Sequence, residues 1–304
     1  MVREAHPYWD CVSAAELEYT AQVAERLRGV AWARPLLDHA RIRGSLPEQM
    51  RNATAPTPEN LSDLFELRFA DELERSGAIA QYEFAAGVGQ STVDFRVTQP
   101  PEWLIELVSL RTTGAVKEAT TEYEFAPGAQ MFGHLLTSDS SSKGNSLQEE
   151  MITAESKIAA KAWLDGKPTK FPLPNVAYHA IVADMRGFGG AGGGEWFEYV
   201  QMSVGVSALP EEERDLALCL PGTRRPIKGL FEPTNPSPAA SAVRERIHIL
   251  GFVAEKAYQE GEITRSLLLI NNSFLFRDAD AVLSACEVFP LKGARIYRPV
   301  IFPV

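Results

Sequence analysis

Residues 91–110 read STVDFRVTQPPEWLIELVSL, and this stretch decides the fold. Its first half alternates Val93, Phe95 and Val97 with polar residues, which is typical of a strand with one buried face. Its second half, 102–110, is apolar almost throughout and rich in β-prone residues, which indicates a strand buried at the centre of a sheet. A short QPP turn separates the two halves. The stretch therefore predicts two consecutive strands that can pair as neighbours.

Each of these strands carries one acid. Asp94 lies on the face of its strand opposite Val93 and Phe95, and Glu106 follows twelve positions later inside the apolar strand. A carboxylate among apolar side chains is costly to bury unless it is paired or bound to a metal ion. A hairpin would bring both carboxylates together at the edge of the sheet. Mg²⁺, or Mn²⁺ in its place, prefers hard oxygen ligands such as two carboxylates, with its other coordination positions left open.

The sequence around the hairpin predicts the other elements. Apolar residues at helical spacing indicate a helix over 61–77 that ends at Gly77, and a strand is expected over 79–87. A long helix is expected over 146–166, followed by a buried strand over 177–185. Helix, three strands, helix and strand in this order predict an α/β fold with a mixed central sheet flanked by helices.

This order of elements and its acids resemble the core of the PD-(D/E)xK nuclease superfamily. The matching residues are Glu66 in FELRFADEL, Asp94 in STVDFRV and Glu106 in WLIELVSL, and the resemblance covers about 60–184. It implies a restriction-endonuclease-like core in which Asp94 and Glu106 bind the metal ion and Glu66 assists through water. The function it implies is metal-dependent hydrolysis of phosphodiester bonds in DNA, or in RNA.

The sequence departs from the family at one position. The family places a lysine two residues after the glutamate, and this chain has Val108 there. Lys157 and Lys161 stand four residues apart on the following helix, and so they share one helix face. The hypothesis is that Lys157 or Lys161 replaces the missing lysine and orients the attacking water.

Three regions are expected along the chain. Residues 1–58 predict a helical N-terminal addition, with one helix over 13–28 and a second over 31–43. Ser13 and Glu16 have the spacing of a capping box at the start of the first helix. Residues 59–185 are expected to form the PD-(D/E)xK-like core.

Residues 186–304 predict a C-terminal α/β extension on the same sheet. Within it, 241–261 is expected to be a helix, 265–276 a buried strand and 294–304 a terminal strand.

Composition limits the partners. The chain has 304 residues and a formal net charge of -10, which disfavours general DNA binding because such binding draws on Lys and Arg. Three widely spaced cysteines indicate a reduced, cytoplasmic protein with neither zinc nor disulfides. No apolar run long enough for a membrane span is found. Nucleic acid is the expected partner, and a homo-oligomer or a protein partner stays open.

A second function is compatible with the same residues. Val108 and the acidic net charge favour a catalytically inactive nuclease-fold protein that binds nucleic acid or a protein partner. In that case Glu106 would be a structural ion-pair residue, with Arg96 or Arg111 as its partner.

A glycine-rich loop suggests a third possibility. Gly187, Gly189 and Gly192 have the GxGxxG spacing of a dinucleotide-binding loop and follow an expected strand. No acid-terminated strand follows at the required distance, so a flexible connector is the preferred interpretation.

Overall fold

A computed structural model describes most of the chain. The described residues are 12–50, 58–86, 88–114, 120–126, 129–134, 146–175, 177–188, 196–209, 211, 214, 228–253, 260–276 and 285–297.

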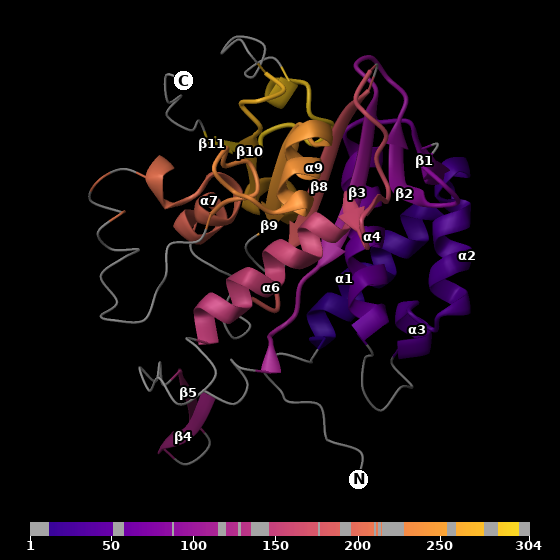
Figure 1. The fold of residues 1–304 in the computed structure, drawn as a ribbon. Coiled ribbons are helices and arrows are strands. Elements are labelled where there is room, and N and C mark those ends of the chain that lie inside the picture. The colour runs from indigo at the N-terminus through magenta and orange to yellow at the C-terminus, as the bar shows by residue number, and fades with distance from the viewer. Residues whose placement is uncertain are drawn as a thin grey trace.

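Seven strands form one mixed sheet in the order β1-β2-β3-β8-β9-β10-β11 (Figure 1). β2 is antiparallel to both β1 and β3, whereas β8 is parallel to both β3 and β9. β9 and β10 are antiparallel, and β10 and β11 are parallel. The expected α/β fold with a mixed central sheet is thus confirmed. The strands of this sheet are β1 (Ala80–Ala85), β2 (Thr92–Val97), β3 (Trp103–Ser109), β8 (Tyr178–Asp184), β9 (Ile249–Val253), β10 (Leu267–Asn271) and β11 (Arg295–Tyr297).

Two short antiparallel pairs lie outside the central sheet. They are β4 (Thr120–Ala126) with β5 (Ala129–His134), and β6 (Trp163–Leu164) with β7 (Lys167–Pro168).

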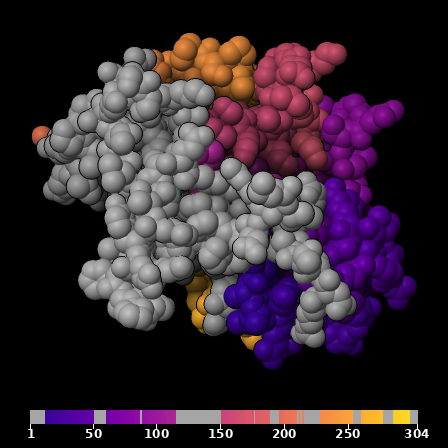
Figure 2. All heavy atoms as spheres, turned by 90° about the horizontal axis from the view of Figure 1, so that it is seen from below, coloured from indigo at the N-terminus to yellow at the C-terminus, as the bar shows by residue number. Residues whose placement is uncertain are grey.

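Helices cover both faces of the sheet, which gives three layers (Figure 1). α1, α2 and α4 pack on one face, and α6, α7 and α9 pack on the other. Seen from below, the N-terminal helices, in indigo and purple, form one side of the molecule (Figure 2). The helices are α1 (Ala14–Leu27), α2 (Arg34–Ile42), α3 (Pro47–Met50), α4 (Pro58–Arg75), α6 (Ser146–Ala160), α7 (Trp196–Val204), α9 (Pro238–Arg246) and α10 (Glu262–Ser266), with short 3-10 turns at Ala31–Ala33 and Val206–Ala208.

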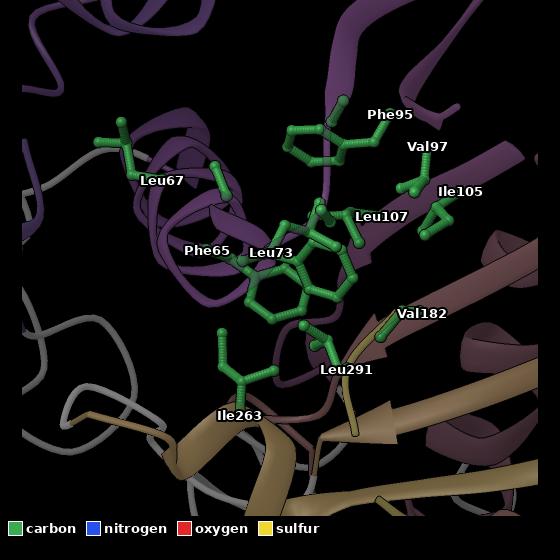
Figure 3. Close-up of a cluster of buried hydrophobic side chains, with 14 of the residues drawn as sticks. Phe65, Leu67, Leu73, Phe95, Val97, Ile105, Leu107, Val182, Ile263 and Leu291 are labelled. Carbon is green, nitrogen blue, oxygen red and sulfur yellow. The ribbon is translucent and has the colours of Figure 1, made fainter. Parts of the chain in front are cut away.

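The core between α4 and the sheet fixes this helix across β2 and β3 (Figure 3). Phe65 and Leu73 of α4 pack against Phe95 of β2 and Leu107 of β3. Ile263, from the C-terminal third of the chain, belongs to the same cluster. Segments far apart in sequence therefore share one core, and α4 is held beside the acid-bearing strands.

The second core lies between α6 and the opposite face of the sheet. Leu104 and Val108 of β3 belong to it, together with Met151 and Ile158 of α6. Val108 is buried, with 7% of its surface exposed. Position 108, where the PD-(D/E)xK superfamily has its lysine, is therefore part of the apolar core beneath α6.

In the region expected to be one helix over 241–261, the described residues form a helix followed by a strand, so that prediction is wrong. α9 ends at Arg246 and β9 begins at Ile249. β9 lies between β8 and β10 with every residue buried. A strand buried on both faces shows no alternation of apolar and polar residues, so its sequence resembles a buried helix segment.

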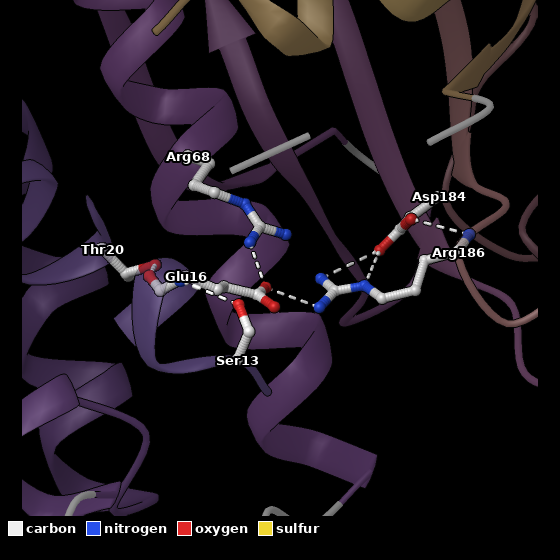
Figure 4. Close-up of polar contacts among 6 residues, drawn as sticks. All are labelled: Ser13, Glu16, Thr20, Arg68, Asp184 and Arg186. Carbon is white, nitrogen blue, oxygen red and sulfur yellow. Dashed lines mark hydrogen bonds and ion pairs between the residues drawn. The ribbon is translucent and has the colours of Figure 1, made fainter. Parts of the chain in front are cut away.

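Four charged side chains form a buried ion cluster that joins α1, α4 and the end of β8 (Figure 4). Glu16 accepts hydrogen bonds from Arg68 and, at 2.6 Å, from Arg186. Arg186 also pairs with Asp184 at 3.3 Å. Ser13 caps α1 by accepting from the N–H of Glu16 at 3.1 Å. The Glu16 side chain reaches the two arginines, so its part in the expected capping box is replaced by a tertiary contact.

The charge of Glu16 is set by these arginines. Burial alone would raise the pKa of its carboxyl, but Arg68 and Arg186 together lower it. Glu16 is therefore ionised at neutral pH despite being 1% exposed.

Within the part of the chain that the structure describes, every helix is too short or too polar to cross a lipid bilayer.

Candidate active site

Asp94 and Glu106 meet where β2 and β3 separate. The paired residues of these strands end at Phe95 and Ile105. One position further on, Asp94 Oδ2 accepts a hydrogen bond from the N–H of Leu107 at 2.6 Å, and Glu106 Oε2 accepts one from the N–H of Asp94 at 3.3 Å. The two acids thus take the place of backbone pairing, and each is held in position by the opposite strand.

Two lysines reach the carboxylate of Glu106. Lys161 Nζ lies 2.6 Å and Lys170 Nζ lies 3.2 Å from Glu106 Oε1. Glu106 is fully buried, whereas the lysine side chains are 28% and 27% exposed. The ammonium groups therefore connect a buried carboxylate to the solvent. Lys161 follows directly after α6, so the end of this helix positions it.

Lys170 was not among the expected site residues. The β6–β7 hairpin places it beside Lys161, since its N–H donates to the Lys161 carbonyl at 3.2 Å. The turn of this hairpin is Asp165-Gly166, with φ of 51° and 78°. An Asp-Gly pair is a recognised signal for a tight hairpin turn, and it was available in the sequence.

Glu66 of α4 contributes a third carboxyl to the surroundings of the site. Tyr82 of β1 donates its hydroxyl proton to Glu66 Oε2 at 2.8 Å. Burial is the main cause that raises the pKa of Glu66 to about 7; the charges of Asp63 and Glu106 act in the same direction, against the hydrogen bond from Tyr82. Glu66 can therefore gain or lose a proton near neutral pH.

The pKa of Asp94 is also raised, well above its usual value. Burial is the main cause, and the negative charges of Glu106 and Glu66 add to it. Burial alone would lower the pKa of Lys161, but Glu106 and Asp94 raise it, so this ammonium stays charged. Three carboxyls face two lysines here, so the carboxyls outnumber the cations that could neutralise them if all three were ionised.

Lys157, the other candidate on α6, lies apart from these acids. It is exposed, and its charged neighbours are Arg111 and Glu150. Burial of its stem lowers its pKa, and the charge of Arg111 lowers it further. The structure therefore brings Lys161 to Glu106 and leaves Lys157 one helical turn away.

The alternative partner Arg96 is engaged elsewhere. Its guanidinium pairs with Glu102 at 2.6 Å and lies over the ring of Phe84.

Two carboxylates of this site are the side chains that could hold a small divalent cation. Among the described residues, no group of three or more His, Cys, Asp and Glu side chains is arranged to hold a metal ion. Asp94 and Glu106 supply two carboxylates, and Mg²⁺ commonly binds through one or two protein carboxylates while keeping several waters. A divalent cation would also offset the excess negative charge that raises the pKa of Asp94. These two residues are the ones that would hold it.

Gly187 has a packing role at the end of β8. A Cβ atom at this position would lie 2.5 Å from the Cα of Arg111, so only glycine allows the two backbones to approach. Gly189 and Gly192, the other glycines of the GxGxxG pattern, lie outside the described residues. The close contact accounts for Gly187 without a dinucleotide.

No protein family, curated protein or solved structure matches the chain.

The raised pKa of Asp94 predicts how stability depends on pH. A carboxyl whose pKa is higher in the folded state binds more protons there, so the stability it provides falls as the pH rises through that value. Asn at position 94 keeps an oxygen for the Leu107 N–H and removes the charge. We expect Asp94→Asn to have a Tm about 2–4 °C above wild type at pH 8, a shift typical of roughly 1 kcal/mol. At pH 5 the difference should be smaller.

Thermal unfolding with and without Mg²⁺ checks this prediction. Mg²⁺ should raise the Tm of wild type at pH 8 and leave that of Asp94→Asn unchanged, because binding stabilises only the form that carries the site. Asp38→Asn is the matched control, since Asp38 is an exposed partner of Arg41. A variant that is less stable than wild type at both pH values would mean that Asp94 serves only to hold the β3 backbone.

Proposed function

We propose that this chain is a metal-dependent nuclease that hydrolyses phosphodiester bonds, with DNA as the favoured substrate. The observation that carries the proposal is the buried Glu106 carboxylate, which contacts the Asp94 backbone with one oxygen and Lys161 with the other. A fully buried acid placed between a second acid and a charged lysine is an arrangement that catalytic sites use.

The fold supports a restriction-endonuclease-like core. α4, β1, β2, β3, α6 and β8 follow one another in the order of the PD-(D/E)xK core, with β3 and β8 parallel. Asp94 and Glu106 lie on the second and third of these strands. In the absence of any matching relative, this assignment rests on the order of the elements and on the residues of the site.

Each residue has a role that follows from its surroundings. Asp94 and Glu106 would hold Mg²⁺ or Mn²⁺, which lowers the pKa of bound water and stabilises charge on phosphate oxygens. Lys161 keeps its proton and can donate it in a hydrogen bond that orients the attacking water. Glu66 has one carboxyl oxygen bound by Tyr82, so the other is the one that can take up the proton of that water near pH 7.

A cleavage assay tests this function. Supercoiled plasmid, linear single-stranded DNA and RNA are incubated with wild type in Mg²⁺, in Mn²⁺ and in EDTA. We expect cutting of DNA with either metal ion and none in EDTA. Asp94→Ala should abolish it, and Asp38→Ala should leave it unchanged. Cutting that survives Asp94→Ala would place the activity at another site.

A second function has two observations in its favour. Val108 is a core residue, and both lysines near the acids are already paired with Glu106. A nuclease fold that has lost catalysis and binds nucleic acid or a protein would have these features. It predicts no cutting by folded wild type, together with DNA binding that weakens steeply as salt increases.

A further inference from the structure

A cavity of about 560 Å³ is lined by residues that include neither Glu106 nor Lys161. It is bordered by α6, by the β6–β7 hairpin and by residues between 228 and 239. Its volume is that of a site for a small organic molecule. The residues that matter for what it could bind are Glu155, Ile152, Trp163, Leu164 and Leu230.

Of the two carboxyls among the described residues that line the cavity, Glu155 and Asp165, Glu155 is the more buried one. Its Oε1 is buried and accepts no hydrogen bond in the described part of the chain. Burial, together with the nearby charge of Glu232, raises the pKa of Glu155 to about 9. Lys228, on the cavity rim, donates its ammonium proton to the carbonyl of Thr234 at 2.9 Å. The charge of Lys228 is not among the causes that set the pKa of Glu155. Among the described residues, no cation therefore lowers the pKa of the Glu155 carboxyl.

The remaining walls are apolar and open to solvent. Ile152 is 49% and Leu164 53% exposed, which leaves large hydrophobic surfaces uncovered in the cavity. Trp163 lines it from the hairpin, and indole rings attract organic cations through their faces. An unpaired acid, an indole and apolar walls together favour a ligand with a positive group on an apolar body.

We propose that this cavity binds a small organic cation, an amidinium, guanidinium or primary amine on an apolar body, with Glu155 accepting its N–H groups. Trp163 and Leu164 contact the apolar body. The site is separate from the acids of β2 and β3, and its occupation does not depend on the chain being a nuclease.

Calorimetric titration with benzamidine tests the proposal. The neutral and nearly isosteric benzamide is the matched ligand, and both are titrated into the full chain at pH 8.5. We expect benzamidine to bind at least 10-fold more tightly than benzamide. Since Glu155 must lose its proton to pair with the cation, benzamidine binding should also weaken between pH 8.5 and pH 7. The other charged groups around the cavity are Asp165, Glu232 and Lys228.

Two variants locate the binding. Glu155→Gln removes the charge and keeps the shape, so it should weaken benzamidine binding at least 10-fold with little effect on benzamide. Glu287→Gln, at an exposed site elsewhere, should bind as wild type does. Equal affinity for the two ligands, no binding of either at millimolar concentration, or full binding by folded Glu155→Gln would each overturn the proposal.

Discussion

Glu16→Ala is expected to lower the free energy of unfolding by about 3–5 kcal/mol, the usual cost of removing one partner from a buried ion pair. Glu16 receives hydrogen bonds from Arg68 and Arg186, whose side chains are 2% and 6% exposed. Without Glu16, Arg68 loses the carboxylate with which it pairs, and Arg186 keeps Asp184. Two guanidinium groups would then share one carboxylate in a site closed to water.

Glu25→Ala on the same helix is the matched control. Glu25 pairs with Arg28, but both side chains are more than half exposed. Exposed pairs of this kind contribute about 0.2–1 kcal/mol. Urea denaturation of wild type and both variants, followed by circular dichroism, gives the comparison. A loss at Glu16 no larger than the loss at Glu25 would show that the cluster adds nothing to stability.

The same comparison has a defined pH dependence. The pKa of Glu16 is lower in the folded protein than its ordinary value of 4.5. Its contribution is therefore present above that ordinary value and is lost as the pH falls through the folded pKa. Wild type and Glu16→Ala should converge in stability as the solution is made acidic.

Lys161→Met is expected to reduce metal-dependent cleavage by about 10²–10³-fold, the loss typical of removing one group that stabilises charge in a transition state. This expectation rests on the proposed function. Methionine keeps the length of the side chain and removes the ammonium that lies 2.6 Å from Glu106. The variant would hold Asp94 and Glu106 in place and lack the cation that orients water beside them.

Lys157→Met is the control that separates the two lysines. Lys157 lies one turn before Lys161 and does not reach Glu106. The cleavage rate of Lys157→Met should therefore stay within about threefold of wild type. Initial rates on plasmid, with Tm values to confirm folding, give the result. Loss of cutting in Lys157→Met with normal cutting in Lys161→Met would assign the role to the other lysine.

The parts of the fold that could be predicted are those with a local signal. Alternation of Val93, Phe95 and Val97 predicted β2, and the apolar run after the turn predicted β3 and the position of Glu106 within it. The pairing of these strands then brought Asp94 to Glu106 without further information.

β9 had no such signal. It is buried on both faces, and its apolar run continues directly from the end of α9. Periodicity alone could not separate a strand from a helix there.

Contacts between segments that are distant in sequence could not be predicted. Glu16 lies 52 residues from Arg68 and 170 residues from Arg186. The spacing of Ser13 and Glu16 predicted a capping box. In the structure the Glu16 side chain binds Arg68 and Arg186 instead. Lys170 was missed for a related reason, because the hairpin that returns it to Lys161 is formed by strands of two residues each.

The pairing of β3 with β8 has a consequence for the newly made chain. Trp103 pairs with Tyr178, which is 75 residues further along. At the roughly 5–20 residues per second of protein synthesis, β3 emerges about 4–15 s before its partner strand. During this interval the apolar edge of β3 has no β8 to cover it. A nascent chain stalled between these strands should therefore be the species most prone to aggregate or to recruit a chaperone.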